Sequence, residues 1–149
     1  MSEPALRADW LGLLARAAPG RLDALCRAAG IAAAFDWLRR PEIGTVMLRG
    51  RIGGTGAPFN LGEITVTRAV LQLSGGGPVG HGHVQGRDRQ AAEWAALCDA
   101  LMQTDRAATV RTGVLDPLAS EGASRTDTRA RKAAATKVEF FTLVRGEDA

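Results

Sequence analysis

The spacing of apolar residues changes twice along the chain, and this change limits the folds open to it. Apolar residues recur every three or four positions up to about residue 30, alternate through much of 34–85, and return to helical spacing over 91–102. A period of about 3.6 indicates an amphipathic helix, and a period of two indicates a half-buried strand. The order lacks the strand-helix-strand alternation of a parallel sheet. The sequence therefore predicts an α+β fold in which an antiparallel sheet of four to five strands packs with helices.

The first 32 residues predict a helical hairpin. One apolar face precedes the breaking pair Pro19-Gly20, and a second ends at Gly30. The apolar positions are Leu6, Trp10, Leu13, Leu14 and Ala17 in the first helix, and Leu22, Leu25, Cys26 and Ala29 in the second.

Residues 33–103 predict a strand meander followed by a helix. The pattern places a strand on each side of a hairpin-length connection at Pro41–Gly44, and a long loop at Gly53–Gly62. In the third strand the apolar phase switches at Thr67-Arg68, which predicts a bulge there or a strand covered on both faces. Val79–Gln85 forms the fourth strand, and Asp88 is the expected N-cap of the helix after it.

Residues 104–149 predict a C-terminal helix and a final strand. We expect 114–118 to be extended or a turn, 124–135 to be helical and 138–145 to be an aromatic strand. No internal repeat interrupts this order. The whole chain, 1–149, is therefore expected to form a single domain.

The composition predicts a soluble cytoplasmic protein. The hydrophobic fraction is 46% and the charged fraction 23%, and no apolar run approaches the roughly 20 residues of a spanning helix. The start of the chain carries acidic residues where a secretory signal would be basic. Cys26 and Cys98, the two cysteines, occupy apolar helical positions and are expected to be buried thiols. We expect no contact with a membrane.

A nucleic-acid partner is not expected. The sequence pI is about 9.5, but the formal net charge of +3 is spread along the chain. Surface aromatic residues between the basic ones, which stack on bases in single-strand binders, are missing.

The glycine-rich segment Gly53, Gly54, Thr55, Gly56 has two interpretations. Glycines let backbone N–H groups converge on an anion, which favours a phosphate cradle. The Gly-Lys-Ser/Thr that completes a Walker loop is missing, because Gly56 is followed by Ala57. A mobile turn beside a strand is the alternative.

His81 and His83 lie two apart on a predicted strand, so both rings project from one face. Such a pair could bind a metal ion, but no third ligand is nearby in the sequence. Two half-exposed strand residues are the alternative, and we expect no metal site.

Arg87 precedes the expected helix and points beyond the sheet, where an anion or a carboxylate of a partner subunit could meet it. A second basic group lies later in the chain. Arg125, Arg129 and Lys132 fall at helical spacing and form either a solvated face or a surface for a nucleotide or an acidic neighbour.

Five short motifs, taken together, carry a family resemblance. They are 53–56 (Gly-Gly-Thr-Gly), 59–63 (Phe-Asn-Leu-Gly-Glu), 67–69 (Thr-Arg-Ala), 84–88 (Val-Gln-Gly-Arg-Asp) and 140–146 (Phe-Phe-Thr-Leu-Val-Arg-Gly). Their order and spacing resemble the PhnG family, the G subunits of the carbon-phosphorus lyase system. The resemblance covers nearly the whole chain, from the first helix with Trp10 to the C-terminal Val-Arg-Gly.

The resemblance implies an accessory subunit of a complex that displaces adenine from ATP with a phosphonate such as methylphosphonate. The product is a ribose 1-phosphonate 5-triphosphate. The implied partners are the I, H and J subunits of the core complex and the L subunit, with the glycosidic chemistry assigned to the I subunit. ATP is then a substrate of the complex, and this subunit is expected to bind no cofactor of its own. The alternative from the residues alone is a stand-alone anion- or nucleotide-binding module.

The expected final strand supplies candidates for a partner interface. Phe140 and Phe141 point to opposite faces of a strand, so a one-sided core can bury only one of them. Arg145 follows in the same segment. The sequence therefore predicts that one of the two phenylalanines contacts a partner.

Overall fold

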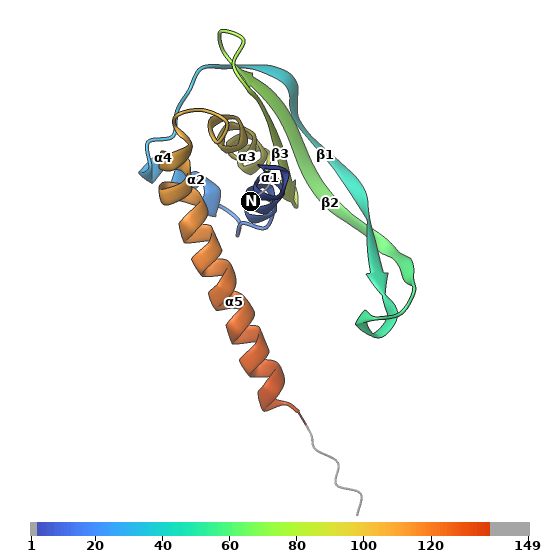
Figure 1. The fold of residues 1–149 in the computed structure, drawn as a ribbon. Coiled ribbons are helices and arrows are strands. Elements are labelled where there is room, and N and C mark those ends of the chain that lie inside the picture. The colour runs from blue at the N-terminus through green and yellow to red at the C-terminus, as the bar shows by residue number, and fades with distance from the viewer. Residues whose placement is uncertain (1–2, 138–149) are drawn as a thin grey trace, which may run out of the picture.

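The computed structural model describes residues 3–137 and has an α+β fold, as predicted (Figure 1). In chain order, the elements are α1 (Glu3–Ala15), α2 (Arg21–Ala28), β1 (Phe35–Arg51), a 3-10 turn (Ile52–Gly54), β2 (Pro58–Leu73), β3 (Val79–Gln85), α3 (Arg89–Leu101), α4 (Ala107–Val110), a π-helical turn (Arg111–Leu115) and α5 (Asp116–Ala135). The strand expected at 138–145 lies outside the described residues.

The sheet has three antiparallel strands in the order β1-β2-β3, so the prediction of four to five strands is wrong for the described residues. The expected connection at Pro41–Gly44 is not a turn, and β1 continues through it. Register shifts between Trp37 and Arg39 and between Arg39 and Glu42 accommodate the proline. β1 is an edge strand, where a residue without an N–H group is tolerated.

The prediction of a long loop at Gly53–Gly62 is also wrong. β2 already begins at Pro58, and Phe59 pairs with Gly50 while Gly62 pairs with Leu48. The connection is therefore short, and β1 and β2 extend as a long hairpin beyond the rest of the sheet (Figure 1). We call residues 43–63 the arm.

β2 has no bulge at Thr67-Arg68, where the apolar phase of the sequence switches. The pairing of β2 with β3 is continuous there, and the irregularity lies across the sheet in β1, between Arg39 and Glu42. Val66 and Thr67 are both buried although consecutive strand residues face opposite sides. The second expectation, a strand covered on both faces, is therefore confirmed at this point.

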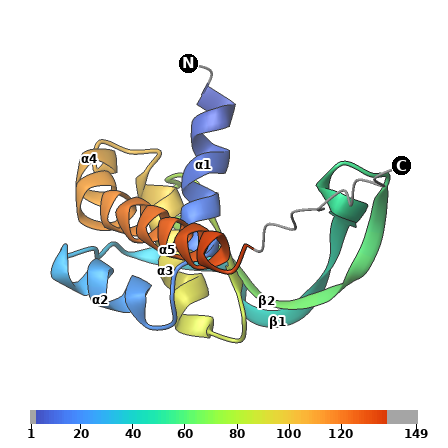
Figure 2. The ribbon, with the colours of Figure 1, turned by 90° about the horizontal axis from the view of Figure 1, so that it is seen from below.

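The helices α1 and α2 form as predicted but do not pair as a hairpin. α1 packs against β3 and α3, whereas α2 packs against α3 and the π-helical turn. Figure 2 shows the two helices at a wide angle to one another. Each helix therefore buries its apolar face against α3, which has buried residues along its length from Ala92 to Leu101.

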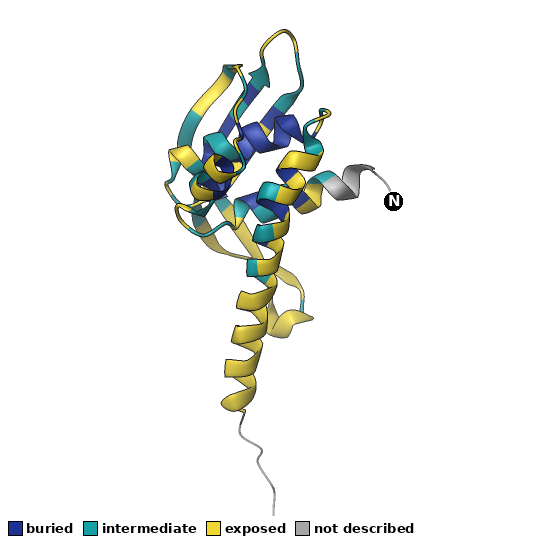
Figure 3. Ribbon diagram, turned by 90° about the vertical axis from the view of Figure 1, so that its left-hand side faces the viewer, coloured by how far each residue is buried: buried dark blue, intermediate teal, exposed yellow. Residues whose placement is uncertain are grey.

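The chain is helical from residue 107 to residue 135, so the prediction of an extended or turn segment at 114–118 is wrong. Pro117 lies in the first turn of α5, where its missing N–H group costs no helical hydrogen bond. Leu118 is buried, but every residue from Ala123 to Lys137 is exposed, and this part of α5 projects from the core (Figure 3). In the described part of the chain, no helix is long and apolar enough to cross a membrane.

The core surrounds α3, which packs against the sheet, α1 and α2, and buried residues of the π-helical turn and α5 complete it. On β3, Gly80 and Gly82 face α3, and a Cβ atom at either position would overlap with backbone atoms of the helix. The alternating pattern Gly-His-Gly-His is thus a packing pattern: the glycines admit α3, and His81 and His83 lie exposed on the other face.

Candidate functional site

A surface groove lies between the end of α1, the end of β3 and the first half of α5. It consists of two adjoining hollows of about 570 Å³ and 610 Å³ that share Arg16, Gln85 and Arg125. Leu13 and Leu118 contribute apolar surface to the first hollow. Residues far apart in the sequence therefore line one concave surface.

Four arginines from three parts of the chain line this groove. Arg16 follows α1, Arg87 lies between β3 and α3, and Arg125 and Arg129 lie one turn apart on α5. Among the residues that the structure describes, Asp88 is the sole acidic one that lines the groove. We call this surface the arginine groove.

Most of these charges have no partner within the described residues. The side chains of Arg16, Arg87 and Arg129 make no hydrogen bond or ion pair there, and Arg125 Nη2 makes one weak hydrogen bond of 3.5 Å to the carbonyl oxygen of Arg16. All four arginines are exposed. The groove is therefore a concave surface with an unbalanced positive charge.

The nearby acidic groups are already engaged. Asp88 caps α3 as predicted, because its carboxylate accepts a hydrogen bond from the backbone N–H of Ala91 at 2.9 Å. Glu121 pairs with Arg21 at 2.6 Å, and this hydrogen bond is the main cause that lowers the pKa of Glu121 below its usual range. Glu121 also attracts Arg125, more weakly than it attracts Arg21, so these carboxylates offset only part of the positive charge of the groove.

The predicted basic face of α5 is confirmed as one surface. Arg125, Arg129 and Lys132 line a shallow hollow together with Ser124 and Thr128. Arg125 and Arg129 also belong to the arginine groove, so this face continues it along the helix.

The glycine loop does not reach this site. The segment 53–56 lies at the end of the arm, beside Arg49 and Arg51. The backbone N–H groups of Thr55 and Gly56 both bond to the carbonyl oxygen of Ile52, so neither is free for an anion. Arg51 Nη1 donates to the carbonyl oxygen of Gly56 at 3.0 Å. The phosphate cradle remains a prediction with little support from this geometry.

His81 and the other predicted residues lie elsewhere. The His81 side chain is exposed on the face of β3 away from α3. Within residues 3–137 no group of three or more His, Cys, Asp or Glu is placed to hold a metal ion. Phe140, Phe141 and Arg145 lie outside the described residues, so the interface predicted for them stays a prediction.

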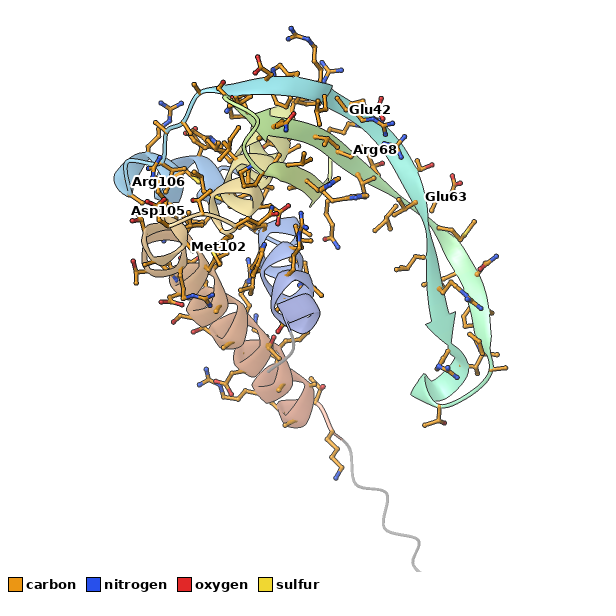
Figure 4. The ribbon with its side chains drawn as sticks, turned by 45° about the horizontal axis from the view of Figure 1, so that its top comes forward. Glu42, Glu63, Arg68, Met102, Asp105 and Arg106 are labelled. Carbon is orange, nitrogen blue, oxygen red and sulfur yellow. The ribbon has the colours of Figure 1, made fainter. Side chains whose placement is uncertain are left out.

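The sheet's outer face carries a different set of charges. Figure 4 shows Glu42 of β1 next to Arg68 of β2, and their ion pair is 2.7 Å long. Arg39 approaches the same carboxylate at 3.2 Å. Both arginines are ion-paired with the single carboxylate of Glu42, whereas no ion pair is formed by the arginines of the groove among the described residues.

Asp99 is a polar residue that the sequence analysis missed. It is completely buried in α3 and accepts hydrogen bonds from Arg7 Nη2 at 2.8 Å, Trp10 Nε1 at 2.9 Å and the backbone N–H of His81 at 2.9 Å. The carboxylate thus joins α1, α3 and the open edge of β3. The sequence does contain one indication of this role, because Asp99 is a single aspartate within the apolar stretch 95–102.

The two cysteines are buried, as predicted. Their Sγ atoms lie 3.6 Å apart between α2 and α3. The hydrogen bond with Cys26, together with burial, raises the pKa of the Cys98 thiol well above its usual range. A protonated, buried thiol is a poor nucleophile.

Comparison with known proteins agrees with the resemblance stated above. The family model described as "Phosphonate metabolism protein PhnG" matches residues 5–146. The chain is also 46% identical over 148 residues to the alpha-D-ribose 1-methylphosphonate 5-triphosphate synthase subunit PhnG of Rhizobium meliloti (strain 1021), covering 97% of this chain and 92% of that protein. The chain therefore belongs to the PhnG family of phosphonate metabolism proteins.

Proposed function

We propose that this chain is an accessory subunit of an alpha-D-ribose 1-methylphosphonate 5-triphosphate synthase and acts in phosphonate catabolism. The observation that carries the proposal is the 46% identity to a subunit of that name along nearly the full length of both chains. ATP and a phosphonate are then the substrates of the complex, and adenine is the leaving group. The partners are the I, H and J subunits together with the L subunit.

The chemistry of the described residues supports an accessory role. The reaction forms a bond between a phosphonate oxygen and C1 of the ribose, and it breaks the bond from C1 to the adenine nitrogen. A nucleophilic side chain is not required for this exchange. The two thiols are buried, so they offer the substrate no accessible nucleophile.

Exclusion of water is the task that such a subunit can perform. The ribose carbon develops positive charge during the exchange, and water at this carbon would hydrolyse ATP instead of forming the phosphonate ester. Positioning of the phosphonate and shielding of the carbon therefore decide the product. We assign the glycosidic chemistry to the I subunit and the shielding to its assembly with this chain.

The arm supports assembly with a partner. None of residues 43–63 is buried. Large apolar side chains exposed on the arm and at its end are Ile43, Met47, Leu48, Ile52, Phe59 and Leu61. An extended apolar surface of this kind is typical of protein interaction sites. We propose that the arm contacts the I subunit.

Two exposed leucines provide a matched test of this contact. Leu61 of the arm is 61% exposed, and Leu38, outside the arm on β1, is 57% exposed. Co-expression with the I, H and J subunits should give a complex that co-purifies with the chain and with Leu38→Asp, whereas Leu61→Asp should be lost from it. Failure of the unchanged chain to co-purify would refute the accessory role. Equal retention of both variants would refute the arm contact alone.

The activity of the assembled complex is the second measurement. With the L subunit added, the complete complex should release adenine from ATP only when methylphosphonate is present. Omission of this chain should abolish the release or divert ATP to plain hydrolysis. Full phosphonate-dependent activity without the chain would contradict the proposal.

The arginine groove favours a second candidate, a stand-alone nucleotide-binding module. This candidate predicts that the chain is purified alone and that adenine release by the other subunits does not depend on it. The co-purification and omission experiments therefore separate the two functions.

A further inference from the structure

We propose that the arginine groove binds a linear polyphosphate, and that in the synthase it holds the triphosphate end of the nucleotide. The assignment to the synthase substrate rests on the function proposed above. The groove itself is defined by Arg16, Arg87, Arg125 and Arg129, which come from three separate parts of the chain.

The charge balance of the groove points to an anion. Four guanidinium groups and one carboxylate line the two hollows, and that carboxylate already accepts the backbone N–H of Ala91. Counted over the four arginines and Asp88, the groove has a formal net charge of +3, which equals the formal net charge of the whole chain. Such an excess in a concave surface attracts anions more strongly than the same charges spread over a flat one.

The shape of the groove favours an elongated anion over a single phosphate. Arg16 and Arg125 line both hollows, Arg129 lines the first and Arg87 lines the second. Each guanidinium can present two parallel N–H donors to phosphate oxygens. A chain of linked phosphates can contact several of these forks at once, whereas one phosphate would leave most of them unused.

The surroundings strengthen the contacts that such a ligand would make. Leu13 and Leu118 replace water on one side of the first hollow, and ion pairs are stronger where water is partly excluded. Gln85 adds an amide donor between the hollows. Along α5, Thr128 and Lys132 continue the polar and basic surface beyond Arg129.

Titration calorimetry on the full chain tests the assignment with sodium tripolyphosphate, ATP and AMP as probes. At an ionic strength of about 0.15 M, tripolyphosphate and ATP should bind with similar affinity, and AMP should bind at least about tenfold more weakly. This order of affinities would show that the groove recognises the phosphate chain and not the adenosine. Equal binding of ATP and AMP, or no binding of tripolyphosphate, would overturn the proposal.

Charge-removing variants locate the site. Arg125→Gln and Arg87→Gln should each weaken tripolyphosphate binding by about tenfold. Arg131→Gln is the matched control, because Arg131 lies on α5 near Arg125 but pairs with Asp127 at 2.9 Å. Arg87 makes no side-chain hydrogen bond or ion pair among the described residues, so Arg87→Gln should melt like the unchanged chain. A loss of affinity in Arg131→Gln as large as in the groove variants would show unspecific attraction and refute the site.

An acidic segment of a partner protein is the competing ligand. A peptide of consecutive glutamates, titrated in the same buffer, should bind more weakly than tripolyphosphate and compete with it poorly. Stronger binding of the peptide would assign the groove to a protein contact and overturn the proposal. The assembly experiments above use the arm and not the groove, so the two proposals can fail independently.

Discussion

The arm and the base of the sheet, which consists of residues 35–42 of β1 and 64–73 of β2, are built from the same two strands but differ in what covers them. At the base, Ala69 and Leu71 lie buried under α3, whereas in the arm Met47 and Leu61 are exposed. Both regions have apolar residues at strand spacing. The comparison shows that the alternating pattern predicts a strand but does not reveal whether a helix of the same chain covers it.

The largest expected difference concerns Asp99 of α3, the helix that packs on the base. Asp99→Ala removes a buried carboxylate and leaves Arg7, the Trp10 indole and the His81 N–H without their acceptor, which should lower the free energy of unfolding by about 3–5 kcal/mol. Urea unfolding measures this change. Asp127→Ala is the control, since its ion pair with Arg131 is exposed and should cost less than about 1 kcal/mol. Similar losses of stability in both variants would show that the buried carboxylate contributes no more than the exposed one.

Glycines give the next difference between the two regions. At Gly82 a Cβ atom would collide with α3, so Gly82→Ala should lower the free energy of unfolding by about 1–3 kcal/mol. In the arm, Gly44 has room for a Cβ atom, and Gly44→Ala should be neutral or slightly stabilising. Thermal melting of the two variants checks the sign of each change. A stable Gly82→Ala protein would mean that α3 can move away from β3 at little cost.

The buried thiol of Cys98 predicts a pH dependence that originates in the helical core and not in the arm. Burial and the Cys26 hydrogen bond raise the pKa of Cys98, so above about pH 8.5 the unfolded chain loses a thiol proton that the folded chain keeps. The free energy of unfolding should then fall with rising pH by up to about 1.4 kcal/mol per pH unit for this group. Denaturant unfolding between pH 8 and 10 measures the slope. An identical slope in Cys98→Ala would assign the effect to other groups.

The smallest expected effect on stability lies in the arm. Leu61→Ser removes an exposed side chain and should change the free energy of unfolding by less than about 0.5 kcal/mol. Leu71→Ala at the base should cost about 2–5 kcal/mol, because Leu71 is fully buried. Urea unfolding of the two isolated variants measures both changes in the free energy of unfolding. A large loss in Leu61→Ser would mean that the arm contributes to the fold and is not reserved for a partner.

Local patterns predicted the candidate site only in part. The position of Asp88 before α3 predicts an N-cap, and this cap is observed. The spacing of Arg125 and Arg129 on α5 predicts a shared face, which is also observed. Arg16 was not predicted, because nothing near it in the sequence indicates that α1 ends beside α5. Its carbonyl oxygen accepts from Arg125, a residue 109 positions away.

The amino-acid sequence alone was enough to predict the α+β class, several individual elements and the family. Helical and alternating spacing act over a few residues, so α3, β3 and the buried cysteines could be predicted without a structure. Tertiary structure alone decided that β1 continues through Pro41, that Asp99 joins three elements, and that the arginines of the groove meet. These features depend on contacts such as Arg7 with Asp99, 92 residues apart, whose geometry arises only when the helices dock on the sheet.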